Sequence, residues 1–166
     1  MFFRIILSIG LVITIAALSF AFSFMIDIGF PGHNEGIQAQ LTGAGGSVIA
    51  DDANIVFDTV INSLDNTIAY NPATGAFTIN RPGDYFISWA VAADGAGPAV
   101  NVTFAISVNG LPYAAMSSPI VSGEVSGDAL VTVGNTPAVI TLVNVTGEGV
   151  FIPATPVQAN IVIFKL

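Results

Sequence analysis

Histidine is the side chain used most often in acid–base catalysis, and this chain contains one, His33. A catalytic triad or a three-ligand metal site needs partners that one imidazole cannot supply, so we interpret His33 as an exposed linker residue beside Asn34 and Glu35. Four serines could act as nucleophiles only with a base to activate them, and no such base accompanies them in the sequence: Ser117, Ser118, Ser122 and Ser126. We therefore predict a protein that is not an enzyme.

The remaining binding motifs are short and incomplete. Asp51-Asp52 offers the carboxylates that calcium prefers, but no further acidic residue follows at ligand spacing, which favours a loop. Asp94-Gly95-Ala96-Gly97 lacks the Lys and the following helix of a phosphate-binding loop. Asn101-Val102-Thr103 and Asn144-Val145-Thr146 fit the glycosylation sequon, yet both fall inside predicted strands. The sequence thus predicts neither a cofactor nor a metal ion.

The scarcity of charge points to self-association. Only 8% of the residues are charged, against roughly 25% in an average soluble domain, and the formal net charge is -8. Between residues 31 and 166 the basic residues are Arg81 and Lys165. A nucleic-acid surface needs clustered Lys and Arg, so that class of partner is excluded. A surface with so little charge is expected to be covered, and with no cysteine for disulfides, stability must come from packing and association.

The strand predicted at residues 83–93 is the centre of the expected fold. Tyr85, Ile87, Trp89 and Val91 share one of its faces, and the opposite face carries Phe86, Ser88, Ala90 and Ala92. Neither face is suited to water, which indicates a core strand covered on both sides. Trp89 and Phe104 could line a ligand groove, but large aromatic side chains on an inward face are more often core.

Similar short strands follow one another along the rest of the chain. They are expected at residues 54–60, 67–70, 76–79, 83–93, 101–108, 113–117, 123–133, 138–145 and 158–164, with a two-residue hairpin at Asn109-Gly110. Many short strands with Gly and Pro turns and no helical period predict an all-β jelly-roll sandwich. The last strand ends apolar on both faces, with Ile161, Ile163 and Phe164 expected in the core or at a contact with a neighbouring subunit.

Two sets of residues carry a family resemblance. Asp65, Tyr70, Phe77, Gly83 and Tyr85 fall at the offsets of the complement-type globular head, a jelly roll of the tumour necrosis factor superfamily, although Thr59, Ile87 and Trp89 depart from its aromatic positions. More specifically, four segments resemble the C-terminal domain of the collagen-like exosporium glycoproteins of bacterial endospores: Phe57-Asp58-Thr59, Tyr70-Asn71-Pro72-Ala73-Thr74-Gly75, Ser88-Trp89 and Val157-Gln158-Ala159-Asn160. The resemblance covers residues 36–166 and implies a tight homotrimer at the spore surface. The collagen-like Gly-X-Y stalk of that family is not present.

The N-terminal segment has three competing interpretations. No charged residue occurs from Ile5 to Ile26, a length of about 33 Å if helical, enough to cross a bilayer. A secretory signal peptide is supported by Arg4 and the small residues of Ser19-Phe20-Ala21, and a membrane anchor is supported by length. The third interpretation, an assembly arm, comes from periodicity. Apolar side chains occupy every second position, a strand pattern that a lipid-facing helix does not need: Leu18, Phe20, Phe22, Phe24, Ile26, Ile28 and Phe30.

These patterns divide the chain into three parts. Residues 1–30 form the apolar arm, residues 31–47 a Gly-rich polar linker, and residues 48–166 the jelly roll, whose first strand can begin near residue 36 because Ile37, Ala39 and Leu41 alternate with glutamines. We interpret the chain as a structural subunit of the spore surface. Its partners are copies of itself, as a homotrimer that stacks head-to-tail into a fibre through the arm, and other spore-surface proteins. The alternatives are a membrane-anchored trimeric surface protein and a receptor- or carbohydrate-binding head that uses the loops at residues 94–98 and 117–119.

Overall fold

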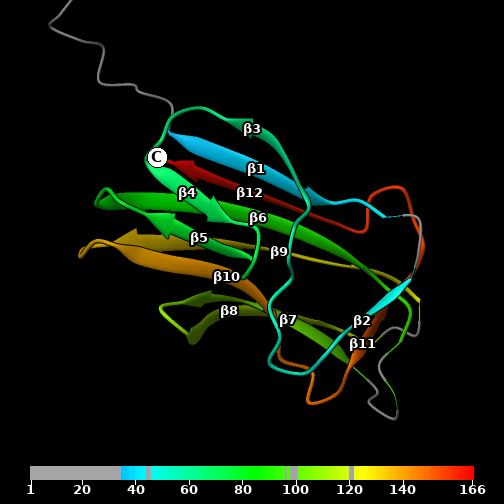
Figure 1. Ribbon diagram of the computed structural model, residues 1–166. Coiled ribbons are helices and arrows are strands. Elements are labelled where there is room, and N and C mark those ends of the chain that lie inside the picture. The colour runs from blue at the N-terminus through cyan, green and yellow to red at the C-terminus, as the bar shows by residue number, and fades with distance from the viewer. Residues whose placement is uncertain (1–34, 44–45, 96, 98–100, 120–121) are drawn as a thin grey trace, which may run out of the picture. The chain divides into compact units, whose positions relative to one another are not determined.

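Short runs of alternating apolar and polar residues form β-strands through the part of the chain that the structure describes, residues 35–43, 46–95, 97, 101–119 and 122–166. The structure is a computed structural model (Figure 1). The strands make two five-stranded antiparallel sheets and a two-stranded ribbon, and the described residues contain no helix. The predicted all-β jelly roll is confirmed. None of the described residues belongs to a helix that could cross a bilayer.

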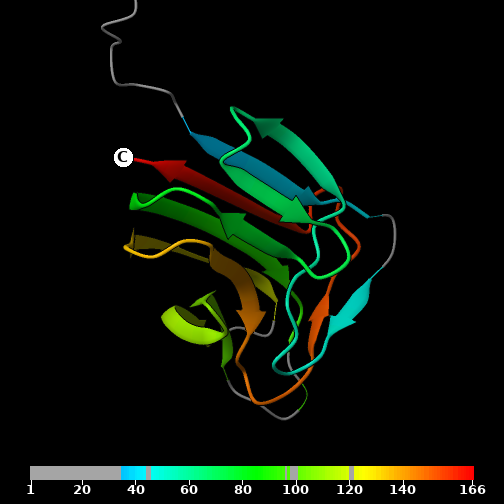
Figure 2. The same cartoon turned by 60° about the vertical axis from the view of Figure 1, so that its left-hand side comes forward.

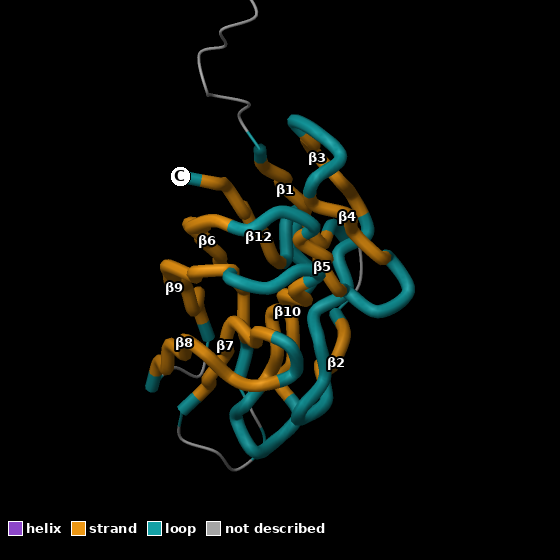
Figure 3. Tube along the Cα trace, turned by 90° about the vertical axis from the view of Figure 1, so that its left-hand side faces the viewer, coloured by secondary structure: helices purple, strands orange, loops and turns teal. Residues whose placement is uncertain are grey.

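The two sheets, called sheet I and sheet II here, lie against each other (Figures 1 and 2). Sheet I has the order β3 (Thr59–Ser63), β1 (Gly36–Leu41), β12 (Ala159–Lys165), β6 (Gly83–Ala93) and β9 (Gly123–Val133). Sheet II has the order β4 (Ile68–Asn71), β5 (Ala76–Ile79), β10 (Ala138–Asn144), β7 (Val102–Val108) and β8 (Leu111–Ser118). The ribbon pairs β2 (Ser47–Ile49) with β11 (Val150–Ile152). Edge strands β9 and β8 meet where the sheets converge (Figure 3).

The core lies between the inward faces of the two sheets. Alternate side chains of β6 are fully buried, as the sequence pattern predicts, and the same holds for Ile161 and Ile163 on β12. Sheet II contributes Phe77, Phe104, Ile140 and Leu142 among others. A core of this size explains how a chain without cysteine stays folded, since each buried aliphatic or aromatic side chain contributes about 1.5–3 kcal/mol.

Trp89 joins the two sheets. Its ring meets Phe104 of sheet II edge to face, with ring centroids 6.3 Å apart. On β9 the directly opposite residue is Gly127, and a Cβ there would lie 2.9 Å from the indole. The glycine therefore makes room for the largest side chain of the core. Trp89 is a core residue, as the sequence predicts, and does not line a groove.

The strand predicted at residues 54–60 is the main error of the sequence analysis. Asn54 makes an isolated bridge to Val143 of sheet II, whereas β3 begins at Thr59 and pairs with β1 of sheet I. Between them, Ile55 and Phe57 are fully buried as the chain crosses from one sheet to the other. Burial therefore alternates along this segment as the sequence predicts, but the segment crosses from sheet II to sheet I and is not one strand.

Other local predictions compare well with the structure. The hairpin turn has Asn109 at φ 52° and Gly110 at φ 81°, the pair of left-handed residues expected of Asn-Gly. The sequence allows residues 36–41 to be either part of the linker or the first strand, and in the structure they form β1. The ribbon strands β2 and β11 escape prediction because three residues are too few to show a period.

Candidate assembly surface

The outward face of sheet I is almost free of charge over its three central strands. On β6, Asp84 is the one charged outward side chain and stands at the beginning of the strand; the outward side chains that follow it are Phe86, Ser88, Ala90 and Ala92, and these four are half-buried in the isolated chain. They line up with Val162 and its neighbours on β12. Such small and apolar side chains form a flat, weakly hydrated surface, which favours contact with another protein surface.

The polar side chains on this face mostly bond to one another. Gln38 Nε2 donates to Asn160 Oδ1 at 2.9 Å, and Gln40 Nε2 donates to the same oxygen at 3.3 Å. These amides satisfy part of their own hydrogen-bonding capacity, so covering them costs less than covering free polar groups. The uncharged character therefore extends across β1 and β12 as well as β6.

One end of this face is distinctly apolar. We call it the proximal end, where Gly36 enters β1 and Phe164 nears the end of β12. The register places Gly36, Phe164, Phe86 and Leu130 side by side in one row across four strands. Phe164 is 37% exposed and Leu130 is 64% exposed. Large apolar side chains gathered in one exposed row are typical of an interaction surface.

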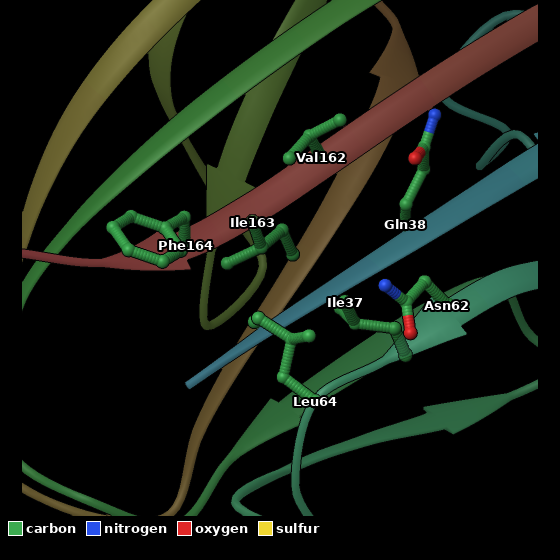
Figure 4. A pocket seen from close by; sticks show the side chains of 8 residues that line it. Ile37, Gln38, Asn62, Leu64, Val162, Ile163 and Phe164 are labelled. Carbon is green, nitrogen blue, oxygen red and sulfur yellow. The ribbon is translucent and has the colours of Figure 1, made fainter. Parts of the chain in front are cut away.

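A pocket of about 110 Å³ opens in this row over β1. Leu64 and Phe164 flank the beginning of β1, and Gln38 and Asn62 continue the lining toward the middle of the sheet (Figure 4). The pocket exists because residue 36 is glycine: a Cβ there would stand 3.3 Å from Phe164 and 3.4 Å from Leu64. We call this pocket the Gly36 socket.

A buried carboxylate fixes the beginning of β1 beside the socket. Glu35 is buried, and its Oε1 accepts from Arg81 and lies 3.4 Å from Lys165 Nζ. Its backbone oxygen also accepts from the Lys165 amide at 2.9 Å. Tyr85 lies beneath this cluster and donates its hydroxyl to the Arg81 carbonyl at 2.8 Å. Burial, reinforced by the nearby Glu35 carboxylate, raises the pKa of Tyr85 to about 12.

The predicted site residues therefore separate into three groups. Tyr85, Ile87, Trp89, Ile161 and Ile163 all point inward and are buried in the core. Phe164 points outward into the proximal row. The proposed arm residues lie outside the described residues, as does His33: Phe20, Phe22, Phe24, Ile26, Ile28 and Phe30.

The loops considered for ligands carry no assembled site in the described part of the chain. Asp51 accepts a hydrogen bond from the Gly147 amide at 2.8 Å and so closes a loop. Ser117 shares a hydrogen bond of 2.8 Å with Thr103 across two strands. Among the described residues, no three His, Asp or Glu side chains come together to hold a metal ion. Residues 96 and 98 of the other candidate loop lie outside the described residues.

Asn144 is an important residue whose structural role the sequence analysis does not identify. It is fully buried, and its Nδ2 donates to the carbonyls of Ile49, Ala50 and Glu148 at 2.8–3.1 Å. Its Oδ1 accepts from the Thr146 amide at 3.0 Å. One side chain thus holds the end of β2 and the loop after β10 together. No local pattern distinguishes it from the exposed Asn101, which has the same Asn-Val-Thr context.

Comparison with solved structures supports the fold. The chain is similar to the tumour necrosis factor Eiger of S. frugiperda, with a TM-score of 0.66 and 10% identity over 80% of this chain and 92% of that one. For the globular domain of zebrafish complement 1qA the TM-score is 0.59, with 17% identity over 80% and 97%. For murine APRIL it is 0.63, with 9% identity over 80% and 99%. No family model and no curated protein matches the sequence. The fold is that of the tumour necrosis factor and complement heads.

Proposed function

We propose that this chain is a structural subunit that assembles with copies of itself at the surface of a bacterial spore. Three heads pack around a threefold axis through the outward face of sheet I, and the trimers join head-to-tail through the arm at residues 1–30 to make a fibre. The observation that carries this proposal is the uncharged outward face formed by β6 from Phe86 to Ala92 and by β12 and β1 beside it. A homotrimer is also what the resemblance to the complement-type head implies.

The charge distribution supports association through this face. Acidic residues are spread over the ends and edges of the described sandwich, whereas the outward positions from Phe86 to Ala92 on β6 and from Asn160 to Phe164 on β12 carry none. Like charges therefore stay away from a central contact, where they would repel one another. A face of this composition resembles the core of an interface more than a solvated surface.

The joint between trimers rests on the arm. Burying Phe20, Phe22, Phe24, Ile28 and Phe30 contributes roughly 1.5–3 kcal/mol per side chain, offset by the cost of ordering the chain. Three arms act together at each joint, so dissociation requires all three to leave. Because the arm and the surface that receives it are different, the contact does not close and so propagates into a filament. Placement at the spore surface rests on the four segments that resemble exosporium glycoproteins.

Deletion of residues 2–30 tests the joint. We expect the truncated protein to form trimers by analytical ultracentrifugation and to form no fibres by negative-stain microscopy, while the full chain forms fibres. The matched control replaces Phe20, Phe22 and Phe24 with serine in the full chain, which keeps the length and removes the apolar pattern. Fibres from either variant would contradict the role of the arm. A monomeric truncated protein would contradict the trimer.

A membrane anchor is the second candidate, because the uncharged run from Ile5 to Ile26 is long enough to span a bilayer. It predicts that the full chain stays in the membrane fraction after carbonate washing. The fibre proposal predicts its recovery in assembled material free of lipid.

A further inference from the structure

We propose that Leu130 of each copy inserts into the Gly36 socket of the next copy, and that this contact closes the trimer. The inference rests on the proposed function, because it identifies the residues through which the three heads meet. It commits to a second copy of this chain as the occupant of the socket.

Leu130 is an exception on its strand. The outward positions of β9 are Glu124, Ser126, Asp128, Leu130 and Thr132, and four of the five are polar. Leu130 is also 64% exposed and lies on the edge strand of sheet I. A large apolar side chain that is this exposed on an otherwise polar edge indicates a contact with another molecule.

The backbone that carries Leu130 is held in place. The Tyr113 hydroxyl of β8 donates to the Leu130 carbonyl at 2.9 Å, so the edge of sheet II supports the edge of sheet I at this position. Leu130 also pairs with Phe86 on β6. A side chain on a fixed backbone loses little freedom when it binds, and this makes it suitable as an anchor.

The socket matches a leucine in size and chemistry. Its volume of about 110 Å³ is several times the roughly 30 Å³ of one water molecule in the liquid, which leaves room for a branched aliphatic side chain. Leu64, Val162 and Phe164 supply apolar walls, and Leu64 is itself 49% exposed. A leucine that filled the socket would bury both partners.

The sheet register places anchor and socket at the same height. Gly36, Phe164, Phe86 and Leu130 are lateral neighbours in one row, with the socket toward one edge of sheet I and Leu130 at the other. A rotation about an axis roughly parallel to the strands does not change height along the strands. A threefold rotation about such an axis can therefore bring Leu130 of one head to the Gly36 socket of the next, and the ring closes after three contacts.

The next row supports the same pairing. Asp128 lies in the row of Ser88, Val162, Gln38 and Asn62, so the docking that seats Leu130 brings Asp128 toward Gln38 and Asn62 of the neighbour. A carboxylate accepts hydrogen bonds from amide groups, and these two amides line the socket. In one row the apolar side chain of Leu130 meets the apolar socket, and in the next row the carboxylate of Asp128 meets the amides of Gln38 and Asn62. Two complementary rows of this kind fix the register between neighbouring heads.

Cysteine cross-linking tests the contact in the full chain, which has no cysteine of its own. In the double variant Leu64→Cys/Leu130→Cys, we expect oxidation to give a covalent trimer of three times 17.0 kDa on a denaturing, non-reducing gel. Each single variant should stay at the monomer mass, and an equimolar mixture of the two refolded together should give covalent dimers and no covalent trimers. The matched control, Leu64→Cys/Glu124→Cys, uses the same strand and face about 20 Å away and should not cross-link.

A second measurement does not depend on disulfide geometry. Leu130→Asp should raise the trimer dissociation constant at least tenfold by analytical ultracentrifugation. Val48→Asp should leave it unchanged, because Val48, although 65% exposed, lies on the separate ribbon of β2 and β11. Circular dichroism of both variants checks that the heads are folded.

The outcomes separate this inference from the proposed function. Trimers that neither cross-link through Leu64→Cys/Leu130→Cys nor weaken with Leu130→Asp would keep the function and overturn the contact. Covalent dimers from the double variant would overturn the closed ring. A cross-link between Leu64→Cys and Phe24→Cys in place of Leu130→Cys would make the arm the occupant of the socket. Monomers of the unmodified chain would overturn the trimer and the contact together.

Discussion

Replacing Asn144 should destabilise the head far more than replacing the asparagine of the same motif at position 101. Asn144 is fully buried and bonds to the carbonyls of Ile49, Ala50 and Glu148 and to the amide of Thr146. Ala50 keeps another partner, the amide of Ala53. Asn144→Ala thus removes the side-chain hydrogen bonds to the carbonyls of Ile49 and Glu148 and to the amide of Thr146.

The magnitude follows from these groups. Ile49 and Thr146 are half-buried and Glu148 is exposed, so water can replace part of the lost bonding, and three lost hydrogen bonds at about 0.5–1.5 kcal/mol each give about 2–4 kcal/mol. A loss of this size lowers the melting temperature by roughly 10 °C or more in a domain of this length. Asn101 is exposed, and Asn101→Ala should change stability by less than about 0.5 kcal/mol.

The isosteric variant Asn144→Asp separates hydrogen bonding from volume. Its carboxylate cannot donate to the carbonyls of Ile49 and Glu148, and it places a charge in a buried site, so it should be at least as harmful as Asn144→Ala at pH 8. When protonated it can donate one hydrogen bond, and the variant should recover part of its stability near pH 4.5.

Urea unfolding followed by tryptophan fluorescence measures these differences, because Trp89 is in the core. The analysis would be refuted if Asn144→Ala and Asn101→Ala lost similar stability, or if Asn144→Asp were as stable as the unmodified protein at pH 8.

Three further predictions follow from the described contacts. Partial desolvation acts to raise the pKa of Asp58, but hydrogen bonds from Thr59 and Thr42 lower it below its ordinary 3.8. Asp58 therefore stabilises the fold above pH 3.8, and this stabilisation is lost as the pH falls further. Asp58→Asn should flatten the acid limb of stability measured between pH 5 and pH 2. Because the pKa of Tyr85 is raised from 10.0 to about 12, the fold should lose stability as the pH rises from 10 toward 12, and Tyr85→Phe should reduce that alkaline slope in urea titrations. Gly127→Ala should cost about 1–3 kcal/mol in thermal unfolding, because its Cβ would lie 2.9 Å from the indole carbon Cζ2 across the strand pair.

Most of the fold is predictable because strand periodicity is a local signal. Residues 76–79, 83–93 and 123–133 are predicted with the same ends that the structure shows, since each run is bounded by turn residues and alternates clearly. The crossover at Ile55 and Phe57 is not predictable in this way. Its burial alternates as in a strand, and only the pairing partners reveal that it belongs to no single sheet.

The surface features depend on distant parts of the chain. The Gly36 socket needs Gly36 of β1, Phe164 of β12 and Leu64, which directly follows β3. The ion-pair cluster around Glu35, called the clasp here, needs Arg81 and Lys165. The sequence identifies Phe164 as a candidate for a contact between subunits, but it does not show that Leu130 lies in the same row. Register fixes that relation, and register is set by strand pairs across the whole head.

The clasp and the socket together give the proximal end a specific role in the proposed fibre. Glu35 anchors the start of β1 to the turn before β6 through Arg81 and to the end of β12 through Lys165. The same start of β1 forms the floor of the socket. If Leu130 of a neighbour fills that socket, closing the trimer also covers the start of β1 at Gly36. Closing the ring would then stabilise the start of β1 in each head before the trimers join, which would favour assembly from trimers over assembly from single chains.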